Sequence, residues 1–484
     1  MDRLKEVERP VKLAIMIQEL KLKPTRALIA AVQLSDVNEA EFQASLNELR
    51  QLAKTLGFQV VGTFTQQRDK FDSGAYLGTG KRQEIRRFVR NESESDDESA
   101  APTHREVDST GSAETAGDMS TRSAEVLVVD HEISPSQARN LEKEIGCEVM
   151  DRTMVILEIF HRHARSRAAR AQVEIVRLNY MAPRLREAAK LAGPQGRQRS
   201  GIGGRGAGES RGELDRRKIR ERIAELQKEL AAIDAERRTQ RERRQERHGL
   251  RRVALVGYTN AGKSTLMRAL TGSEVLVADK LFATLDTTVR ALRPDSVPRV
   301  LVSDTVGFIK NLPHGLVASF KSTLDEALEA SLLVHVIDAT DPGWEGQREV
   351  TEHVLAEIGA ATIPRILVFN KIDRIGGEIA EKEREAALRA RHPDCIVMSA
   401  KRESDVAKLH AAIVSFFQRS LVDAELFLPW TAQQLRSDIF SKCEVLDEHA
   451  DSEGTTLRVR GDLEAINRLR EHIGDLSAAT ERQK

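Results

Sequence analysis

The chain has 484 residues, too many for one hydrophobic core, and this length predicts about three domains. Lysine plus arginine and aspartate plus glutamate number 75 each, so the net charge gives no general attraction to nucleic acid. Aromatic residues make up 4% of the chain, which argues against a protein that binds RNA by stacking bases on a sheet.

The cysteines and the first residues bear on the compartment. Cys147, Cys395 and Cys443 lie far apart, in neither zinc-site spacing nor a disulfide framework, which favours a reducing compartment. The first residues hold a short apolar patch broken by charges, unlike a signal peptide. The sequence has no apolar run of about 18 residues that could span a membrane. We expect a cytoplasmic protein, and a monomer.

Residues 1–152 are expected to form a small α/β domain. Three apolar runs predict strands, at 27–34, 58–64 and 125–130. Helices are predicted at 39–57 and at 134–146, and the second begins with a capping-box pattern of Ser134, Pro135 and Gln137. Because strands and helices alternate, the sheet should be mainly parallel.

A change of composition interrupts this domain at residues 91–124. The segment is rich in Ser, Asp, Glu, Thr and Ala and has almost no large apolar side chain. Such a segment cannot bury enough surface to offset the entropy lost on ordering. It predicts a disordered insertion in a loop, and a regulatory role is the less favoured alternative.

Residues 153–249 predict an arm of two antiparallel helices. The second helical stretch, 213–249, carries apolar residues at spacings of four and three, typical of a helix-packing seam: Ile219, Ile223, Leu226, Leu230 and Ile233. The first stretch, roughly 153–192, is less regular and has no helix breaker before Pro183. The residues between them, 193–212, are rich in glycine and arginine and would lie at the far end of the arm.

Four arginines of this loop stand among glycines, where no core can absorb them: Arg197, Arg199, Arg205 and Arg211. Arginines on a flexible loop suit the phosphates of RNA. From the residues alone, a merely solvated loop is an equal alternative.

Residues 250–420 predict a second α/β domain, built around a phosphate-binding loop. A strand at 253–256 leads into Gly257-x-x-x-x-Gly262-Lys263-Ser264, and a helix follows. Glycines let backbone N–H groups turn toward phosphate oxygens, and the helix N-terminus adds a partial positive charge. In such a loop the lysine reaches the β- and γ-phosphates and the serine hydroxyl binds Mg²⁺.

Three further motifs follow in order, each at the end of a predicted strand. Asp304 can hold Mg²⁺ through water, and the N–H of Gly307 can meet the γ-phosphate. In Asn370-Lys371-x-Asp373, the carboxylate of Asp373 can accept from N1–H and N2–H₂ of guanine, which selects GTP over ATP. Ser399-Ala400-Lys401 is suited to contact guanine O6 through backbone N–H groups. Together the motifs predict a GTPase.

Phe308 occupies the position after Gly307, where Ras-like switches carry a glutamine that orients the attacking water. A phenyl ring can neither donate nor accept this hydrogen bond, so we expect a slow basal rate and stimulation by a partner. A GTPase switch also needs a threonine that binds Mg²⁺ and senses the γ-phosphate. From the residues alone, Thr284, Thr287 and Thr288 are equal candidates.

Residues 421–484 predict a small α+β tail domain, with a hairpin formed by 443–449 and 455–461 and a helix at 462–473. The expected fold class is therefore α/β. A P-loop GTPase domain with a mainly parallel sheet is preceded by a smaller α/β domain and the arm, and is followed by the tail domain.

The chain resembles the HflX family of ribosome-associated GTPases, of the same broad class as the Obg GTPases. The matching stretches are YLGTGKRQE at 76–84, ISPSQARNLE at 133–142, GIGGRGAGE at 201–209, GYTNAGKSTL at 257–266, LFATLD at 281–286, DTVGFI at 304–309 and NKID at 370–373. The resemblance implies that Thr284 is the switch threonine and that a hydrophobic residue after Gly307 is usual in the family. It also implies binding to the large ribosomal subunit and its RNA, and splitting or rescue of stalled or idle ribosomes. The alternative is a regulatory GTP-binding module that acts as an assembly checkpoint on the large subunit.

The motifs and the resemblance together define the candidate site. The candidate catalytic residues are Lys263, Thr284 and Gly307, and the candidate Mg²⁺ ligands are Ser264 and Thr284, with Asp304 acting through water. The candidate nucleotide-binding residues are Gly257, Tyr258, Thr259, Asn260, Ala261, Gly262, Lys263, Ser264, Thr265, Phe282, Ala283, Thr284, Leu285, Asp286, Asp304, Thr305, Val306, Gly307, Asn370, Lys371, Asp373, Ser399, Ala400 and Lys401.

Asn260 raises the question of a second cation. The phosphate-binding loop is similar to that of several GTPases that lack the glutamine, in which an asparagine at this position holds K⁺ beside the phosphates. A cation there can neutralise charge that develops in the transition state. The alternative, that Asn260 only shapes the loop, is equally open.

Overall fold

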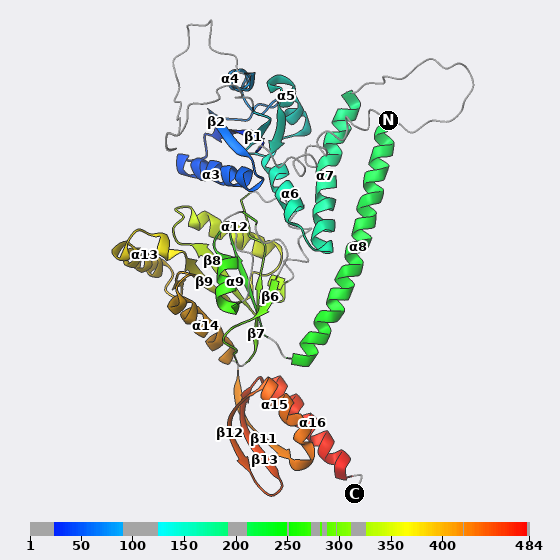
Figure 1. Cartoon of the computed structure of the whole chain (residues 1–484), viewed down its shortest axis with the longest axis vertical. Coiled ribbons are helices and arrows are strands. Elements are labelled where there is room, and N and C mark those ends of the chain that lie inside the picture. Colours follow the sequence, from blue (N-terminus) through cyan, green and yellow to red (C-terminus); the bar gives the residue numbers. More distant parts are fainter. Residues whose placement is uncertain are drawn as a thin grey trace, which may run out of the picture. The chain divides into compact units, whose positions relative to one another are not determined.

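The computed structural model describes residues 24–90, 124–191, 211–248, 251–272, 281–282, 288–296, 298–310, 326–419 and 421–481 (Figure 1). The contacts divide the chain into two compact units. The first comprises Met1–Ile159 and Arg177–Glu221, and the second Phe160–Val176 and Arg222–Lys484. Most of the predicted insertion, residues 91–123, lies outside the described ranges.

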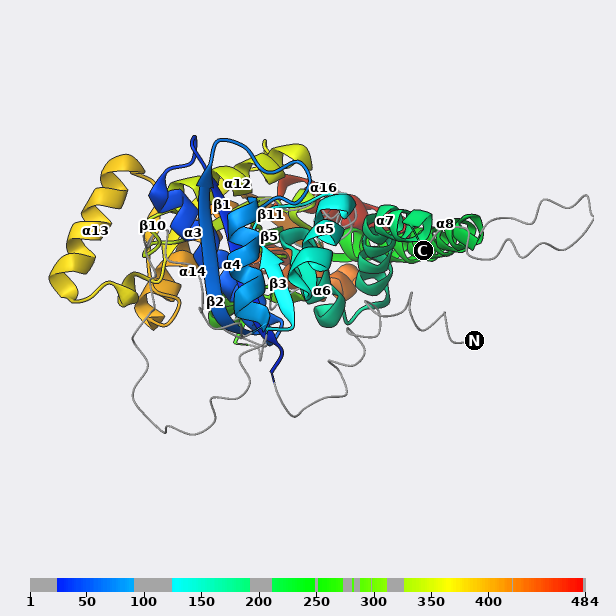
Figure 2. The ribbon, with the colours of Figure 1, turned by 90° about the horizontal axis from the view of Figure 1, so that it is seen from above.

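The first unit contains a four-stranded sheet of order β2-β1-β3-β4 in which every pair is parallel, as predicted. Its strands are β1 (Arg26–Leu34), β2 (Gln59–Arg68), β3 (Val126–Val129) and β4 (Glu148–Asp151). Its helices are α3 (Glu39–Thr55), α4 (Thr79–Arg90) and α5 (Pro135–Ile145), seen from above in Figure 2. Ser134 and Gln137 form the predicted capping box of α5. The short strand β4 was not predicted.

Three long helices follow: α6 (Arg152–His163), α7 (Arg167–Leu191) and α8 (Arg211–His248). The prediction of one continuous helix over 153–192 was wrong, because helix α6 ends at His163 and α7 begins at Arg167. Ser166 caps the start of α7, since its hydroxyl oxygen accepts from the N–H of Ala169 at 3.1 Å. Pro183 does not end this stretch but lies inside α7.

Helices α7 and α8 are antiparallel, as predicted (Figure 1). Glu174 pairs with Arg222 at 3.0 Å and Arg167 pairs with Glu229 at 2.9 Å, so the numbering runs in opposite directions along the two helices. The predicted seam of α8 is its less exposed side: Leu226 is buried, and Ile219, Ile223, Leu230 and Ile233 are half-buried.

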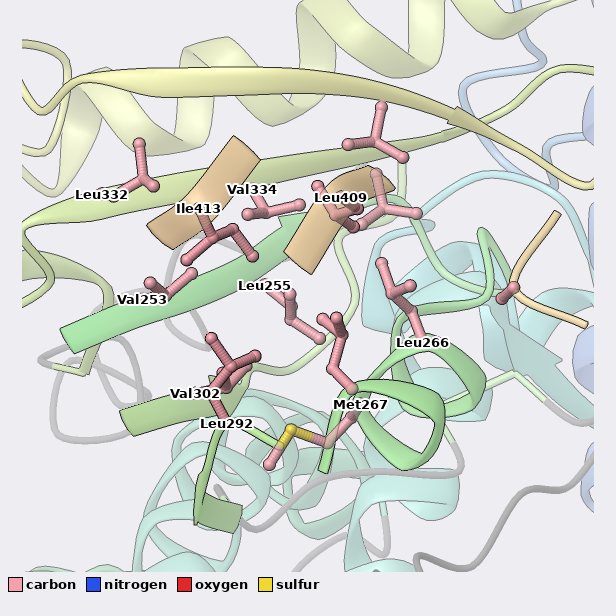
Figure 3. Packing of buried hydrophobic residues seen from close by; sticks show 14 of the residues in the cluster. Val253, Leu255, Leu266, Met267, Leu292, Val302, Leu332, Val334, Leu409 and Ile413 are labelled. Atoms are coloured by element: carbon pink, nitrogen blue, oxygen red, sulfur yellow. The ribbon is translucent and has the colours of Figure 1, made fainter. Parts of the chain in front are cut away.

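The second unit contains a six-stranded sheet of order β10-β9-β8-β5-β7-β6 in which only β6 is antiparallel. Its strands are β5 (Arg251–Gly257), β6 (Thr288–Ala291), β7 (Val300–Asp304), β8 (Leu332–Asp338), β9 (Arg365–Asn370) and β10 (Ile396–Val397). The helices described with it are α9 (Lys263–Thr271), α12 (Trp344–Glu357), α13 (Glu378–Arg391) and α14 (Glu403–Gln418). Figure 3 shows Val253, Leu255 and Val334 of the sheet packed with Leu266 and Met267 of α9. This core fixes the strand ends that carry the motifs.

The tail forms a three-stranded antiparallel sheet of order β11-β13-β12. The predicted hairpin is present as β12 (Glu444–Ala450) and β13 (Gly454–Gly461), and the predicted helix as α16 (Leu463–Glu481). Strand β11 (Val422–Pro429) was missed, although Val422, Ala424, Leu426 and Leu428 alternate with more exposed residues. The short helices η2 (Trp430–Leu435) and α15 (Arg436–Lys442) were missed as well. Across the described ranges, no helix combines the length and the hydrophobicity that crossing a bilayer requires.

Candidate nucleotide-binding site

The loop from Gly257 to Ser264 joins β5 to α9 and needs glycine at two positions. Gly257 has φ +145°, and a Cβ there would lie 2.1 Å from the carbonyl oxygen of Val336. Gly262 has φ +97°, and a Cβ there would lie 2.3 Å from Nδ2 of Asn370. Any side chain at either position would therefore force the loop away from its neighbouring strands.

Lys263 begins α9, and its ammonium lies inside the loop. Its Nζ donates to the carbonyl oxygens of Gly257 at 3.0 Å and Tyr258 at 2.8 Å. Burial lowers the pKa of Lys263 to about 8, although the nearby charge of Asp304 acts in the opposite direction. A buried ammonium at this position attracts the phosphates of a nucleotide, whose negative charge would restore its proton affinity.

Ser264 and Asp304 meet at the ends of α9 and β7. The Ser264 hydroxyl donates to Oδ2 of Asp304 at 2.7 Å, and Asp304 is fully buried. A hydroxyl beside a carboxylate suits a Mg²⁺ ion that binds the hydroxyl directly and the carboxylate through water. No cluster of three His, Cys, Asp or Glu that could hold a metal occurs among the described residues. Ser264 and Asp304 supply few ligands of their own, so they fit an ion that takes most of its ligands from phosphate and water.

The segment after Asp304 turns back onto the phosphate-binding loop. Strand β7 pairs Asp304 with Leu255, and further on Phe308 forms a parallel bridge with Tyr258. The N–H of Phe308 donates to Gly257 O at 3.1 Å, and the N–H of Thr259 donates to Phe308 O at 2.7 Å. Between the two pairings one chain advances by three residues and the other by four, so this segment bulges before it re-pairs.

Gly307 lies at this bulge, against Lys263. A Cβ on Gly307 would be 2.9 Å from Lys263 Nζ and from Thr259 Cα, so only glycine fits. The ring of Phe308 is 2% exposed and packs into the core. Phe308 therefore contributes its backbone, and not its side chain, to the site.

Asn370 joins the two candidate base-recognition motifs. Its Nδ2 donates to Ala261 O at 3.0 Å, and its Oδ1 accepts from the N–H of Ala400 at 2.9 Å. The asparagine therefore ties the phosphate-binding loop to the segment that carries Ser399, Ala400 and Lys401.

Asp373 is held ionised at the edge of the site. Burial acts to raise its pKa, but donation from the Ser399 hydroxyl at 2.7 Å and the charges of Lys401 and Arg402 outweigh burial, and the net pKa is lowered. An ionised carboxylate is the form that can accept two hydrogen bonds from guanine.

Two supporting carboxylates were missed by the sequence reasoning. Asp338 pairs with Lys371 at 2.9 Å, and Asp405 accepts from the N–H of Ser399 at 3.1 Å. Asp338 ends strand β8, as Asp304 ends β7, and this position could have identified it. Asp405 lies in the first turn of α14, where carboxylates are common, so its sequence position carries little information.

Several predicted residues lie outside the described ranges. Ala283, Thr284, Leu285 and Asp286 are among them, as are Arg197, Arg199 and Arg205. Arg211 is the first residue of α8, and its side chain is not described. Among the described residues, the structure brings together the predicted residues of the phosphate-binding loop, the Asp304–Gly307 segment and the two base motifs.

The fold and the site define a P-loop GTPase. Residues 252–371 match the family model described as 50S ribosome-binding GTPase, residues 163–244 match the GTP-binding GTPase middle region, and residues 43–96 and 97–161 match the GTP-binding GTPase N-terminal region. The GTPase HflX of Gluconacetobacter diazotrophicus is 51% identical over 92% of this chain and 97% of its own. That of Caldanaerobacter subterraneus subsp. tengcongensis is 37% identical over 94% and 96%. The chain belongs to the HflX family of GTPases.

Among solved structures, a GTP-binding protein from the archaeon Sulfolobus solfataricus in complex with GDP is similar to this chain. It is 22% identical, with a TM-score of 0.41 over 80% of this chain and 99% of that one.

Proposed function

We propose that this GTPase binds the large ribosomal subunit and uses GTP to split or rescue stalled or idle ribosomes. The main support is the match of residues 252–371, which hold most of the site, to a family of 50S ribosome-binding GTPases. The antiparallel pair α7 and α8 is a second support, because the residues between these helices in the sequence include the glycines and arginines suited to RNA phosphates.

Hydrolysis in this proposal depends on groups held by the two loops. Lys263 neutralises charge on the β- and γ-phosphates, and the N–H of Gly307 donates to the γ-phosphate. Mg²⁺, held by Ser264 and Thr284 and through water by Asp304, would supply Lewis-acid stabilisation of the phosphates. The ring of Phe308 is buried and orients no water. The basal rate of hydrolysis is therefore slow, and binding to the ribosome orders the remaining groups that hydrolysis needs.

Asn260 is the proposed ligand of a K⁺ ion beside the phosphates. Its backbone is left-handed, with φ +58°, and its Oδ1 accepts from Lys371 Nζ at 3.4 Å. The side chain thus already presents an oxygen to a positive charge. Replacing K⁺ by Na⁺ at constant ionic strength should lower ribosome-free turnover, and Asn260→Ala should remove this difference while GTP still binds. Equal rates in the two salts, with and without large subunits, would assign Asn260 a structural role only.

The test of the arm compares the parent with a chain that lacks residues 196–208. GTP and GDP affinities and the ribosome-free rate should be unchanged, because the site lies in 251–401. Stimulation of GTP turnover by large subunits should fall. Equal stimulation of the two proteins would contradict a role for the loop in ribosome action.

A further inference from the structure

Asp405 lies in the first turn of α14, and its carboxylate reaches back to the segment that carries Ser399. Its Oδ2 accepts from the N–H of Ser399 at 3.1 Å, and its Oδ1 accepts from Nζ of Lys408 at 3.2 Å. Asp405 is 8% exposed, whereas the side chain of Lys408 is 72% exposed. One oxygen of the Asp405 carboxylate therefore binds a backbone group of the candidate site inside the protein.

Ser399 is fully buried, and each of its polar groups has a partner. Its N–H donates to Asp405, and its carbonyl oxygen accepts from the N–H of Arg402 at 3.0 Å. Its hydroxyl donates to Oδ1 of Asp373 at 2.7 Å and accepts from the N–H of Lys401 at 3.2 Å. A buried residue bonded at all of these groups has little freedom to move, so its position fixes the hydroxyl that Asp373 accepts.

Asp373 has one buried and one exposed partner. Its Oδ1 accepts from the buried hydroxyl of Ser399, whereas its Oδ2 lies 3.7 Å from Nζ of Lys401, whose side chain is 67% exposed. An ion pair with a long, exposed side chain restricts a carboxylate little. The hydroxyl of Ser399 is therefore the stronger constraint on how the Asp373 carboxylate is turned.

A chain of hydrogen bonds thus runs from Asp405 through Ser399 to Asp373. We propose that Asp405 is a positioning residue for base recognition, which holds Ser399 in place and so turns the Asp373 carboxylate to accept both donors of guanine. Asp405 acts on the base only through Ser399. This inference rests on the proposed role of Asp373 in recognising guanine.

The alternative is that Asp405 only stabilises the start of α14. A carboxylate in the first turn of a helix interacts favourably with the helix dipole, and Glu403 lies in the same turn. The two roles differ in what their loss changes. A displaced Asp373 would lower the preference for guanine, whereas a weaker helix start would lower Tm and leave the ratio of nucleotide affinities unchanged.

Inosine diphosphate (IDP) is the probe, because hypoxanthine keeps N1–H and O6 of guanine but lacks its 2-amino group. The preference for GDP is measured as the ratio of the Kd for IDP to the Kd for GDP. For Asp405→Ala we expect this ratio to fall roughly fivefold, in line with the loss of one hydrogen bond. Asp405→Asn should keep the ratio, because the amide oxygen can still accept from the N–H of Ser399. Glu403→Ala is the control for the helix start and should keep the ratio as well.

Asp405→Ser guards the test against an alanine variant that does not fold. Serine is accepted at helix starts, but its oxygen is one bond closer to the backbone, so it should lower the ratio as Asp405→Ala does. An unchanged preference for GDP in both variants would overturn the proposal. A fall of equal size in Glu403→Ala, or in Asp405→Asn, would overturn it as well.

Asp373→Ala separates the inference from the role on which it rests. If Asp373 recognises guanine, Asp373→Ala removes most of the preference for GDP over IDP, and adding Asp405→Ala lowers the ratio little further, because both changes act on the same contact. A parental preference in Asp373→Ala would overturn the role of Asp373 and with it the inference. A lost preference in Asp373→Ala combined with a parental one in Asp405→Ala would overturn the inference alone.

Discussion

The N–H of Lys310 donates to the phenol oxygen of Tyr258 at 2.8 Å. Tyr258 lies in the phosphate-binding loop, and Lys310 lies three residues beyond Gly307. This bond and the bridge between Tyr258 and Phe308 hold the backbone around Gly307 against the phosphate-binding loop. A site without the water-orienting glutamine depends on an ordered backbone at this position. Tyr258 therefore holds the segment that carries Gly307 in place, in addition to being part of the phosphate-binding loop.

Tyr258→Phe removes this hydroxyl and keeps the ring. Loss of one such bond costs about 1 kcal/mol, so we expect single-turnover GTP hydrolysis to slow roughly fivefold, with GTP affinity nearly unchanged. Tyr76→Phe is the matched control, because the Tyr76 hydroxyl also accepts from a backbone N–H, that of Val32 at 3.2 Å, but within the N-terminal sheet. Equal hydrolysis rates in both variants and the parent would contradict the role given to Tyr258.

The lowered pKa of Lys263 predicts that nucleotide binding takes up a proton. Burial places this pKa at about 8 in the free protein, and the phosphates of GDP should raise it. Affinity should then be greatest below pH 8 and fall as the pH rises above it. Titration calorimetry in buffers of different ionisation enthalpy should report a proton uptake that grows as the pH rises from 7 to 9. Binding heats that do not depend on the buffer would refute a neutral Lys263 in the free protein.

Asp373→Asn should exchange the base preference from guanine to xanthine. The amide can donate to the 2-oxo group of xanthine, whereas it cannot accept both guanine donors as the ionised carboxylate does. GTP should bind more weakly and xanthosine triphosphate more tightly in competition assays. A variant that still prefers GTP would contradict the assignment of Asp373 to base recognition.

Glu148 predicts a pH-dependent stability of the N-terminal sheet. Burial, together with the charges of Glu142 and Glu158, raises its pKa to about 7 from 4.5. A raised carboxyl pKa means that the folded state holds the proton longer, so its cost to stability grows from pH 4.5 to pH 7 and stays constant above. Glu148→Gln should therefore raise the free energy of unfolding by about 1–2 kcal/mol at pH 8, after allowance for partial exposure, and change it little at pH 4.5. A gain of equal size at both pH values would contradict the ionisation argument.

The sequence predicted the elements that carry most of the candidate nucleotide site because each motif is local. A glycine loop after a strand, Asp304 at the end of β7 and Asp373 after β9 each have a position set by their own element, and parallel strands bring these ends to one edge. The three N-terminal strands and the tail hairpin were predicted from short-range patterns in the same way.

What the sequence did not show depends on contacts between distant segments. The close approach of Phe160 to Phe282, and of Asn370 to both Ala261 and Ala400, follows from packing that no local periodicity encodes. The break between α6 and α7 is different, since Ser166 is a recognisable helix start that an apolar pattern on both sides obscured.

We propose that GTP energy is used to part ribosomal subunits, and sucrose-gradient profiles of vacant 70S ribosomes test this proposal most directly. With the protein and GTP, we predict conversion of 70S particles to free subunits, with the protein on the large subunit. The chain without residues 196–208 should leave the 70S peak in place. Binding only to preformed large subunits, with the 70S peak unchanged by the intact protein and GTP, would contradict splitting and support an assembly checkpoint instead.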